Sequence, residues 1–116
     1  MKVMPPLAFS LTIDKTAVID RSGQVTVSGT VSCSRPLPVD VSGSLKQLFA
    51  NRVTISGTFS THFDCAAPQT RWSVATHGDN GNFAAGNATE SATAYGCELS
   101  CHSAGKTQAV RLSAKK

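Results

Sequence analysis

Apolar and polar side chains alternate strictly along residues 25–33, and this period of two restricts the chain to a β-sheet fold. Val25, Val27, Val31 and Cys33 occupy odd positions, whereas serine and threonine fill the even ones. Successive side chains of a strand point to opposite faces, so this pattern turns one face toward a core and the other toward water. The segment is therefore predicted to be a half-buried strand.

The composition of the whole chain is that of a single all-β domain. Its 116 residues suffice for one hydrophobic core. Only 6% are aromatic and 16% charged, with nine glycines and five prolines, which suits short strands joined by tight turns. The net charge of +4 and the ordered alternation argue against disorder. We expect one domain over residues 1–116, with residues 1–7 and 113–116 flexible.

Further alternating segments predict seven or eight strands and no helix. Residues 25–33 and 38–45 are expected to form a hairpin, since Arg35 and Pro36 separate them. A third strand is expected over residues 52–59, continuing on the same face to Cys65. Other strands are expected at residues 8–13, 70–76, 87–96 and 107–112, and the strongest turn signal is Gly-Asp-Asn-Gly-Asn at 78–82. The predicted fold class is all-β, an antiparallel β-sandwich.

Two of these predicted strands resemble each other. VTVSGTVSC at 25–33 matches VTISGTFS at 53–60, and residues 88–97 hold a weaker copy. Duplication of a hairpin would explain the match. We favour a physical explanation, in which Ser-Gly-Thr between apolar residues makes a thin strand with a polar outer face. The spacing lacks the regularity of a solenoid or propeller repeat.

Four cysteines in a small strand-rich chain favour disulfide bonds and an oxidising compartment. If the strands alternate in direction, Cys33, Cys65 and Cys97 all end strands of the same direction and gather at one end of the sandwich. Three pairings can join the four cysteines. We favour Cys33 with Cys65 and Cys97 with Cys101, because the second pair is four residues apart and can close a small loop.

The two ends of the chain bear on location and partners. The N-terminal sequence MKVMPPLAF is not a secretory signal, because two prolines interrupt it and no apolar stretch of about 7 to 15 residues follows. We therefore expect the mature form of a secreted protein. No apolar run of about 18 residues occurs, so no transmembrane segment is predicted. Four cations in the last eleven residues are interpreted as solvated charges on and after an edge strand, not as a nucleic-acid site.

Other uses of the cysteines have weaker support. Cys97, Cys101 and His102 resemble a covalent haem attachment motif, but three residues instead of the usual two separate the cysteines. Zinc ligation by these three residues with Cys65 lacks the paired CxxC knuckles of strong zinc motifs. Asp79 is one carboxylate where a tight calcium site uses several. The sequence therefore predicts no cofactor and no metal site.

Catalysis has even less support. No serine lies in a GxSxG motif. His62 and Asp64, two residues apart, come nearest to a base–acid pair, and we interpret them as the end of a strand leaving the sheet. The seven acidic residues lie in predicted loops and outer faces and give no preferred couple for glycoside chemistry. The chain is not expected to be an enzyme, and no catalytic residue is predicted.

The aromatic residues give mixed signals. Trp72 alternates with Val74, which predicts burial in the core. Tyr95 stands two residues before Cys97, as the tyrosine corner of immunoglobulin strands does. However, Trp72 lies thirty-nine residues beyond Cys33, whereas an immunoglobulin domain places its tryptophan shortly after the first cysteine.

Several motifs occur in a fixed order between residues 24 and 112. They are VTVSGTVSC, a cysteine before Ala-Pro, a strand around Trp72, Phe-Ala-Ala-Gly from Phe83, and Ala-Thr-Ala-Tyr-Gly-Cys before a last cysteine and a final strand. This order resembles small secreted bacterial immunoglobulin-like domains of no assigned function. The resemblance implies an exported, immunoglobulin-like antiparallel β-sandwich of seven or eight strands with two disulfides. It carries no active residues. The size and disulfide layout are also loosely similar to bacterial apoproteins that carry enediyne chromophores.

We expect a non-enzymatic extracellular module that acts through its surface, in adhesion, at a cell surface or in filament assembly. A free sheet edge can accept a strand from a neighbour. The candidate edge strand is Ala8, Phe9, Ser10, Leu11, Thr12 and Ile13. The partner would be a protein, a cell surface or another copy of the chain, and not a nucleic acid. The alternative is a small-molecule carrier whose hydrophobic cleft is lined by Phe49, Phe59, Phe63 and Trp72.

Overall fold

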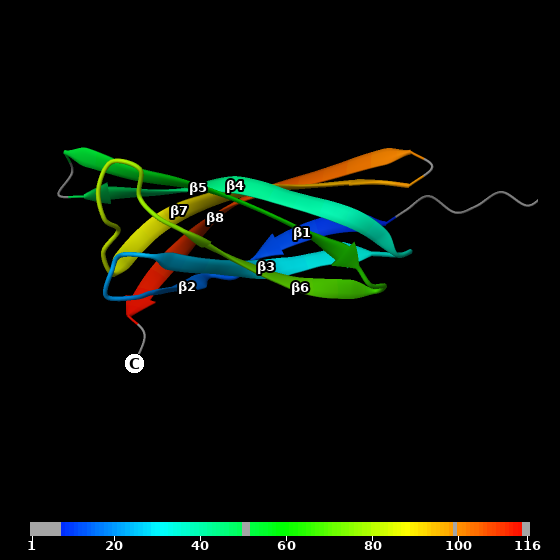
Figure 1. Cartoon of the computed structure of the whole chain (residues 1–116), viewed down its shortest axis with the longest axis horizontal. Coiled ribbons are helices and arrows are strands. Elements are labelled where there is room, and N and C mark those ends of the chain that lie inside the picture. The colour runs from blue at the N-terminus through cyan, green and yellow to red at the C-terminus, as the bar shows by residue number, and fades with distance from the viewer. Residues whose placement is uncertain (1–7, 50–51, 99, 115–116) are drawn as a thin grey trace, which may run out of the picture.

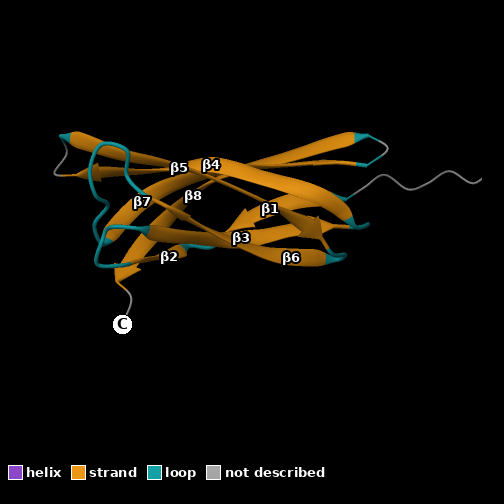
Figure 2. Cartoon of the chain, viewed as in Figure 1, coloured by secondary structure: helices purple, strands orange, loops and turns teal. Residues whose placement is uncertain are grey.

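Strands account for all the regular secondary structure in residues 8–49, 52–98 and 100–114, which are the residues that the computed structural model describes (Figure 2). These strands are β1 (Phe9–Ile13), β2 (Thr16–Ile19), β3 (Val25–Cys33), β4 (Leu37–Phe49), β5 (Val53–Cys65), β6 (Gln69–Thr76), β7 (Gly86–Cys97) and β8 (Cys101–Ala114). The all-β class is therefore confirmed. Residues 1–7 and 115–116, expected to be flexible, lie outside the described residues, whereas residues 113 and 114 belong to β8.

The strands form two layers (Figure 1). One layer contains β1, β3 and β6, and the other contains β8, β7, β4 and β5 in that order, with antiparallel neighbours in both. The short strand β2 joins the layers, because it pairs antiparallel with β3 and parallel with β8. This arrangement is the immunoglobulin-like antiparallel β-sandwich predicted from the sequence, with one parallel pair added.

The predicted hairpin between residues 25–33 and 38–45 is wrong. β3 pairs with β1, β2 and β6, whereas β4 pairs with β5 and β7. The chain thus crosses from one layer to the other between Cys33 and Leu37. Alternation fixes which face of a strand is buried, but it leaves open which strand is its neighbour. The crossing places the apolar faces of β3 and β4 in different layers, where they face each other across the core.

The core lies between the layers and is built mainly from the inward-facing positions of β3, β4 and β7. These alternate with outward-facing serine and threonine residues, as the sequence predicts. Full burial of a valine or leucine side chain contributes about 1.5–3 kcal/mol. The largest fully buried aliphatic side chains are Val25, Val27, Val31, Val39, Val41, Leu45 and Leu112.

Two glycines make room for an aromatic stack in this core. The rings of Phe59 and Trp72 stack with their centroids 6.2 Å apart. A Cβ on Gly29 would lie 2.7 Å from Trp72 Cζ2, and one on Gly43 would lie 2.8 Å from Phe59 Cζ. Each glycine thus faces inward while the hydroxyl side chains beside it face outward. The Ser-Gly sequence in these strands therefore has a packing function.

Candidate functional site

The disulfides have the pairing that the sequence analysis favours. Cys33 is bonded to Cys65, and Cys97 to Cys101. The first bond links the two layers, and the second closes the tip of the β7–β8 hairpin. No thiolate remains at these positions for zinc or haem chemistry. In the described parts of the chain, no three His, Cys, Asp or Glu side chains gather in a way that could hold a metal ion.

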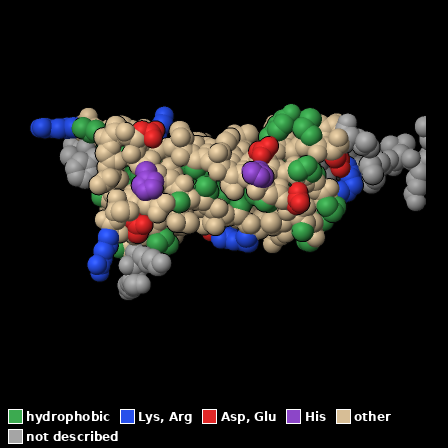
Figure 3. All heavy atoms as spheres, in the orientation of Figure 1, with side chains coloured by type: hydrophobic (Ala, Val, Ile, Leu, Met, Phe, Trp, Pro, Cys, Tyr) green, Lys and Arg blue, Asp and Glu red, His purple; other side chains and the backbone are tan. Residues whose placement is uncertain are grey.

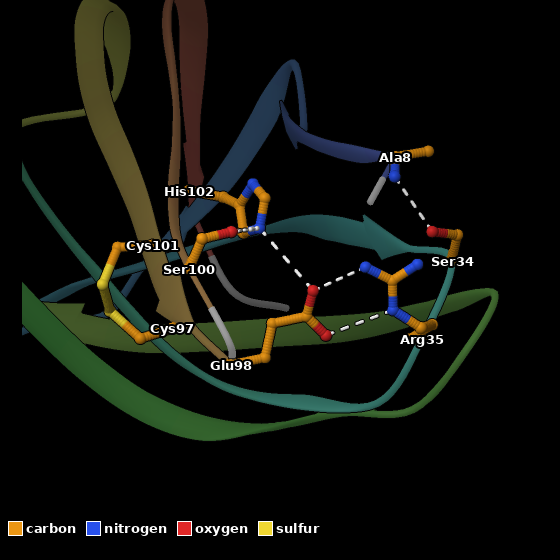
Figure 4. Close-up of polar contacts among 8 residues, drawn as sticks. All are labelled: Ala8, Ser34, Arg35, Cys97, Glu98, Ser100, Cys101 and His102. Carbon is orange, nitrogen blue, oxygen red and sulfur yellow. Dashed lines mark hydrogen bonds and ion pairs between the residues drawn. A yellow bond between two sulfur atoms is a disulfide. The ribbon is translucent and has the colours of Figure 1, made fainter. Parts of the chain in front are cut away.

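Charged side chains cluster beside the Cys97–Cys101 loop (Figure 4). Arg35, between β3 and β4, donates two hydrogen bonds to the carboxylate of Glu98, one of them from Nε to Oε2 at 3.2 Å. These bonds hold the pKa of Glu98 below its usual value despite partial desolvation, and Glu98 in turn raises the pKa of Arg35. The ion pair fastens the hairpin tip to the β3–β4 connection.

This cluster contains a serine, a histidine and a carboxylate, but they do not form a catalytic relay. Ser100 Oγ lies 3.3 Å from His102 Nε2, and Glu98 Oε1 lies 3.7 Å from the same nitrogen. In a hydrolytic triad the carboxylate holds the other ring nitrogen, so that the first is free to take the serine proton. Here both groups compete for one nitrogen. The geometry fits a clasp on the hairpin tip instead.

Of the four aromatic residues predicted to line a cleft, Phe59, Phe63 and Trp72 have described side chains, and these do not form an exposed cleft. Phe59 and Trp72 have only 6% and 4% of their surface exposed and stack inside the core. The burial predicted for Trp72 is confirmed. Phe63 packs against the core from farther along β5. Phe49 ends β4, and its side chain lies outside the described residues. The stack fills the space that a ligand would need between Phe59 and Trp72.

The remaining sequence candidates lie apart from one another. His62 and Asp64 are exposed on β5, and no hydrogen bond or ion pair joins them in the described structure. Tyr95 is 49% exposed on the outer face of β7, so it does not form a tyrosine corner. In the turn at 78–82, the Asn80 side chain donates to the Thr54 carbonyl at 2.8 Å and accepts from the Ser56 N–H at 3.1 Å. This turn therefore docks on β5.

One acidic residue was placed wrongly by the sequence analysis. Glu90 does not lie in a loop or on an outer face, because β7 turns its side chain into the core, where it is 1% exposed. Neither carboxylate oxygen has a hydrogen-bond partner among the described residues. Burial, with a smaller contribution from the negative charge of Asp14, raises its pKa to about 7. Glu90 occupies an even position on β7, as three buried alanines do, and this alternation is the sequence signal that indicates its burial.

The predicted N-terminal edge segment is built into the sheet of its own chain. Phe9–Ile13 form β1, which pairs with β3 from Phe9 opposite Cys33 to Ile13 opposite Gly29. Ala8 continues this contact, since its N–H donates to Ser34 Oγ at 2.9 Å. β1 stands at the end of the strand order. The segment is thus an edge strand that is already paired on one side.

A second open edge, which the sequence analysis missed, lies along β8. This strand begins at Cys101 instead of residue 107, and β2 pairs only with its last part, from Arg111 to Ala114. Residues 101–110 pair with β7 alone. No strand of the described chain is hydrogen-bonded to this side of β8, because β1 pairs with β3, although β1 lies beside β8 and the rings of Phe9 and His102 are 6.4 Å apart.

Hydrogen bonds show which backbone groups point to this edge. The Arg111 N–H donates to the Lys15 carbonyl at 2.8 Å, away from β7. Residues of an antiparallel strand alternate in the side to which their N–H and C=O point, so Thr107 and Ala109 also point outward. The Gln108 side chain donates to the Ala109 carbonyl at 2.9 Å. A side chain thus occupies a position that a neighbouring strand would otherwise fill.

A comparison with protein families identifies the family to which this β-sandwich belongs. The chain belongs to the family of unknown function DUF6299. The family model matches residues 8–113, so all eight strands fall within it except the last residue of β8. A comparison of the sequence with curated proteins finds no match.

Among solved structures, the chain is similar to AggA, the major subunit of aggregative adherence fimbriae type I from Escherichia coli. The TM-score is 0.52 with 12% sequence identity, and the alignment covers 99% of each chain. At this identity the likeness establishes the fold. Both are therefore β-sandwiches of the same overall plan. In the described part of the chain, no helix has the length and apolar character needed to cross a membrane.

Proposed function

We propose that the protein is a non-enzymatic extracellular module that acts through sheet edges, in adhesion or assembly. The observation that carries this proposal is the open edge of β8 over residues 103–109. Backbone donors and acceptors at such an edge can pair with a strand of another chain, whatever the side chains.

The β8 edge lacks most of the features by which natural proteins prevent open sheet edges from pairing with each other. Proteins blunt open edges with charges, prolines or bulges. Here the register with β7 runs without a break from Gly86 opposite Leu112 to Cys97 opposite Cys101, so β8 has no bulge. The segment from residue 103 to 109 contains no proline and a single charge, Lys106. A long edge with a regular register and a single charge is suited to strand addition.

Two further observations support the extracellular role. Two disulfides in one small domain are typical of proteins that fold in an oxidising compartment. The similar AggA is a subunit of adherence fimbriae, so this sandwich plan occurs in a protein that assembles outside the cell. We infer that the present chain is exported and associates with other chains.

The occupant that we propose for the edge is the β8 edge of a second copy. Two identical edges can pair antiparallel across a twofold axis, and each then supplies the partner for the other. The side chains at residues 103, 105, 107 and 109 are serine, glycine, threonine and alanine, which leave room for close approach.

Proline at an outward-pointing position tests the proposal. Ala109→Pro removes an N–H that faces the open edge, and edge strands tolerate such a proline. We expect the wild-type molar mass, measured by light scattering after size exclusion, to rise with concentration, while Ala109→Pro stays monomeric with an unchanged circular dichroism spectrum. Thr107→Ala, which changes a side chain and leaves the backbone intact, should associate like wild type. A wild-type protein that stays monomeric at all concentrations would refute edge pairing.

A further inference from the structure

The outer face of the layer β5-β4-β7-β8 carries rows of short hydroxyl side chains. Strand register aligns Ser42 with Ser60 and Thr93, and it aligns Ser44 with Thr58 and Ser91. The surface is hollowed here by about 540 Å³, and the hollow is lined by Ser42, Ser44, Ser91, Thr93 and Thr107 among others. We call this the hydroxyl hollow. It offers hydrogen-bond donors and acceptors, and Lys106 is the one charged residue that lines it.

A second hollow of about 550 Å³ continues along the same strands and is lined by Lys15, Lys46 and Arg111. Lys46 stands opposite Thr89 of β7, and Thr89 opposite Ala109 of β8. Ser44, Ser91 and Thr107 line the hydroxyl hollow. On each of the three strands, the residue that lines the second hollow is two positions away from one of these: Lys46 on β4, Thr89 on β7 and Ala109 on β8. We call this the cationic hollow. Residues two apart on a strand are separated by roughly 7 Å, so the two hollows adjoin.

The three cations come together from separate parts of the chain. Lys15 lies between β1 and β2, Lys46 on β4 and Arg111 on β8. The Arg111 N–H to Lys15 carbonyl bond of 2.8 Å holds two of them side by side. Strand pairing thus fixes the backbone positions of Lys46 and Arg111, and this hydrogen bond fixes that of Lys15.

No acidic side chain of the described chain lines the cationic hollow. Among the described residues, the ion pairs that involve arginine lie elsewhere, between Arg35 and Glu98 and between Arg71 and Asp14. Glu90 follows Thr89 in sequence but turns its carboxylate into the core. Three like charges around one hollow repel one another, and a bound anion would offset that repulsion. The charge pattern therefore fits an anionic ligand.

We propose that this face binds an acidic polysaccharide. Carboxylate or sulfate groups would pair with the cationic hollow, and sugar hydroxyls would hydrogen-bond in the hydroxyl hollow. A linear polymer lying along the strands contacts both hollows at once. The side chains involved project from the face of the layer, so the proposal is independent of pairing at the β8 edge.

The surface chemistry favours a polysaccharide over the other polyanions. Nucleic-acid sites without sequence preference add aromatic side chains on which bases stack, and neither hollow is lined by an aromatic residue. A membrane-binding face carries a continuous apolar surface. Among the residues that line the cationic hollow, Leu48 is the one large apolar residue that is strongly exposed, at 59%, so the hollow lacks such a surface. On the face drawn in Figure 3, Lys, Arg, Asp and Glu side chains are scattered and do not gather in one patch.

Binding of defined polymers tests the proposal. The probes are polygalacturonate, which carries carboxylates, dextran sulfate, and uncharged dextran, with affinity measured by isothermal titration calorimetry at two salt concentrations. We expect binding of one or both charged polymers and none of dextran. The double variant Lys46→Gln/Arg111→Gln should weaken binding at least about tenfold, because two charge-assisted contacts are lost. Thr93→Val should weaken binding of the polymers without changing the response to inorganic sulfate.

The matched control removes two exposed cations that line neither hollow. Arg21→Gln/Arg52→Gln lowers the net charge by the same two units and should leave the affinity within about twofold of wild type. An equal loss in both double variants would overturn the proposal, because binding would then depend on net charge alone. The proposal would also be overturned if uncharged dextran bound as tightly as the charged polymers. Tighter binding to duplex DNA or to phosphatidylserine vesicles than to either charged polymer would overturn it as well. Thermal melts of each variant confirm that the fold is retained.

Discussion

The bond between Cys33 and Cys65 joins β3, in the middle of one layer, to the end of β5, the outermost strand of the other. Its two cysteines are 32 residues apart, whereas Cys97 and Cys101 are four apart. The two disulfides therefore constrain very different lengths of unfolded chain.

Removal of the disulfides should reveal this difference in length. By loop entropy, Cys33→Ala/Cys65→Ala should lower the free energy of unfolding by about 4 kcal/mol, and Cys97→Ala/Cys101→Ala by about 2 kcal/mol. Urea denaturation of the two double variants measures both losses. An equal loss, or a larger one at the hairpin tip, would contradict this ranking.

The buried carboxyl of Glu90 should make stability fall as pH rises. Its folded pKa of about 7 lies above the ordinary value of 4.5, so the folded state binds more protons than the unfolded state between these values. The stability that this proton contributes is complete below pH 4.5 and is lost as pH rises through 7. The interval corresponds to about 3 kcal/mol. We expect Glu90→Gln to unfold at higher urea than wild type at pH 8 and to lose most of the difference at pH 5.

Glu98 offers a matched control with the opposite sign. Arg35 lowers its pKa, so its contribution is present above the unfolded pKa and is lost as pH falls. Glu98→Gln should therefore lower stability at pH 8 and leave the fall due to Glu90 in place. A Glu90→Gln variant with the same pH profile as wild type would show that this carboxyl is not desolvated in the folded state.

Two glycines of the same layer, on β4 and β8, should respond in opposite ways to alanine. A Cβ at position 43 would collide with the Ser91 carbonyl oxygen and approach Phe59 Cζ to 2.8 Å. We expect Gly43→Ala to destabilise the protein by about 1–3 kcal/mol through overpacking. A Cβ at position 105 would come no closer than 3.5 Å, to Thr93 Oγ1, so Gly105→Ala should be neutral or stabilising by up to about 1 kcal/mol. Thermal denaturation of both variants compares them directly.

The Arg35–Glu98 clasp should control local opening at the hairpin tip. The Glu98 N–H is bonded to the Ser100 carbonyl at 3.0 Å, and its exchange with solvent reports on this loop. Arg35→Ala should speed that exchange. Arg71→Ala breaks the ion pair with Asp14 elsewhere on the molecule and should leave it unchanged. Exchange followed by NMR would show equal rates in both variants if the clasp had no local role.

Local patterns in the sequence determined the strands and their buried faces. Alternation around Val27 and Trp72 identified inward-facing residues, because a strand has a fixed period of two whatever its neighbours are. The same period of two also places Glu90 on the inward face of its strand. Because a carboxyl is normally excluded from a core, Glu90 was wrongly predicted to lie outside it. Cysteine spacing favoured the observed disulfides, since a separation of four residues suits a short loop.

Strand partners were decided only in the tertiary structure. The alternating pattern fits both a β3–β4 hairpin and a crossing between layers. The crossing forms because it sets the apolar faces of β3 and β4 against each other across the core. The cationic hollow and the open edge of β8 have the same origin. Lys15, Lys46 and Arg111 are far apart in sequence, and they meet because β2 bends away from β1 to pair with the end of β8. The sequence by itself thus set the character of each strand face, whereas long-range pairing set which faces and edges remain exposed for binding.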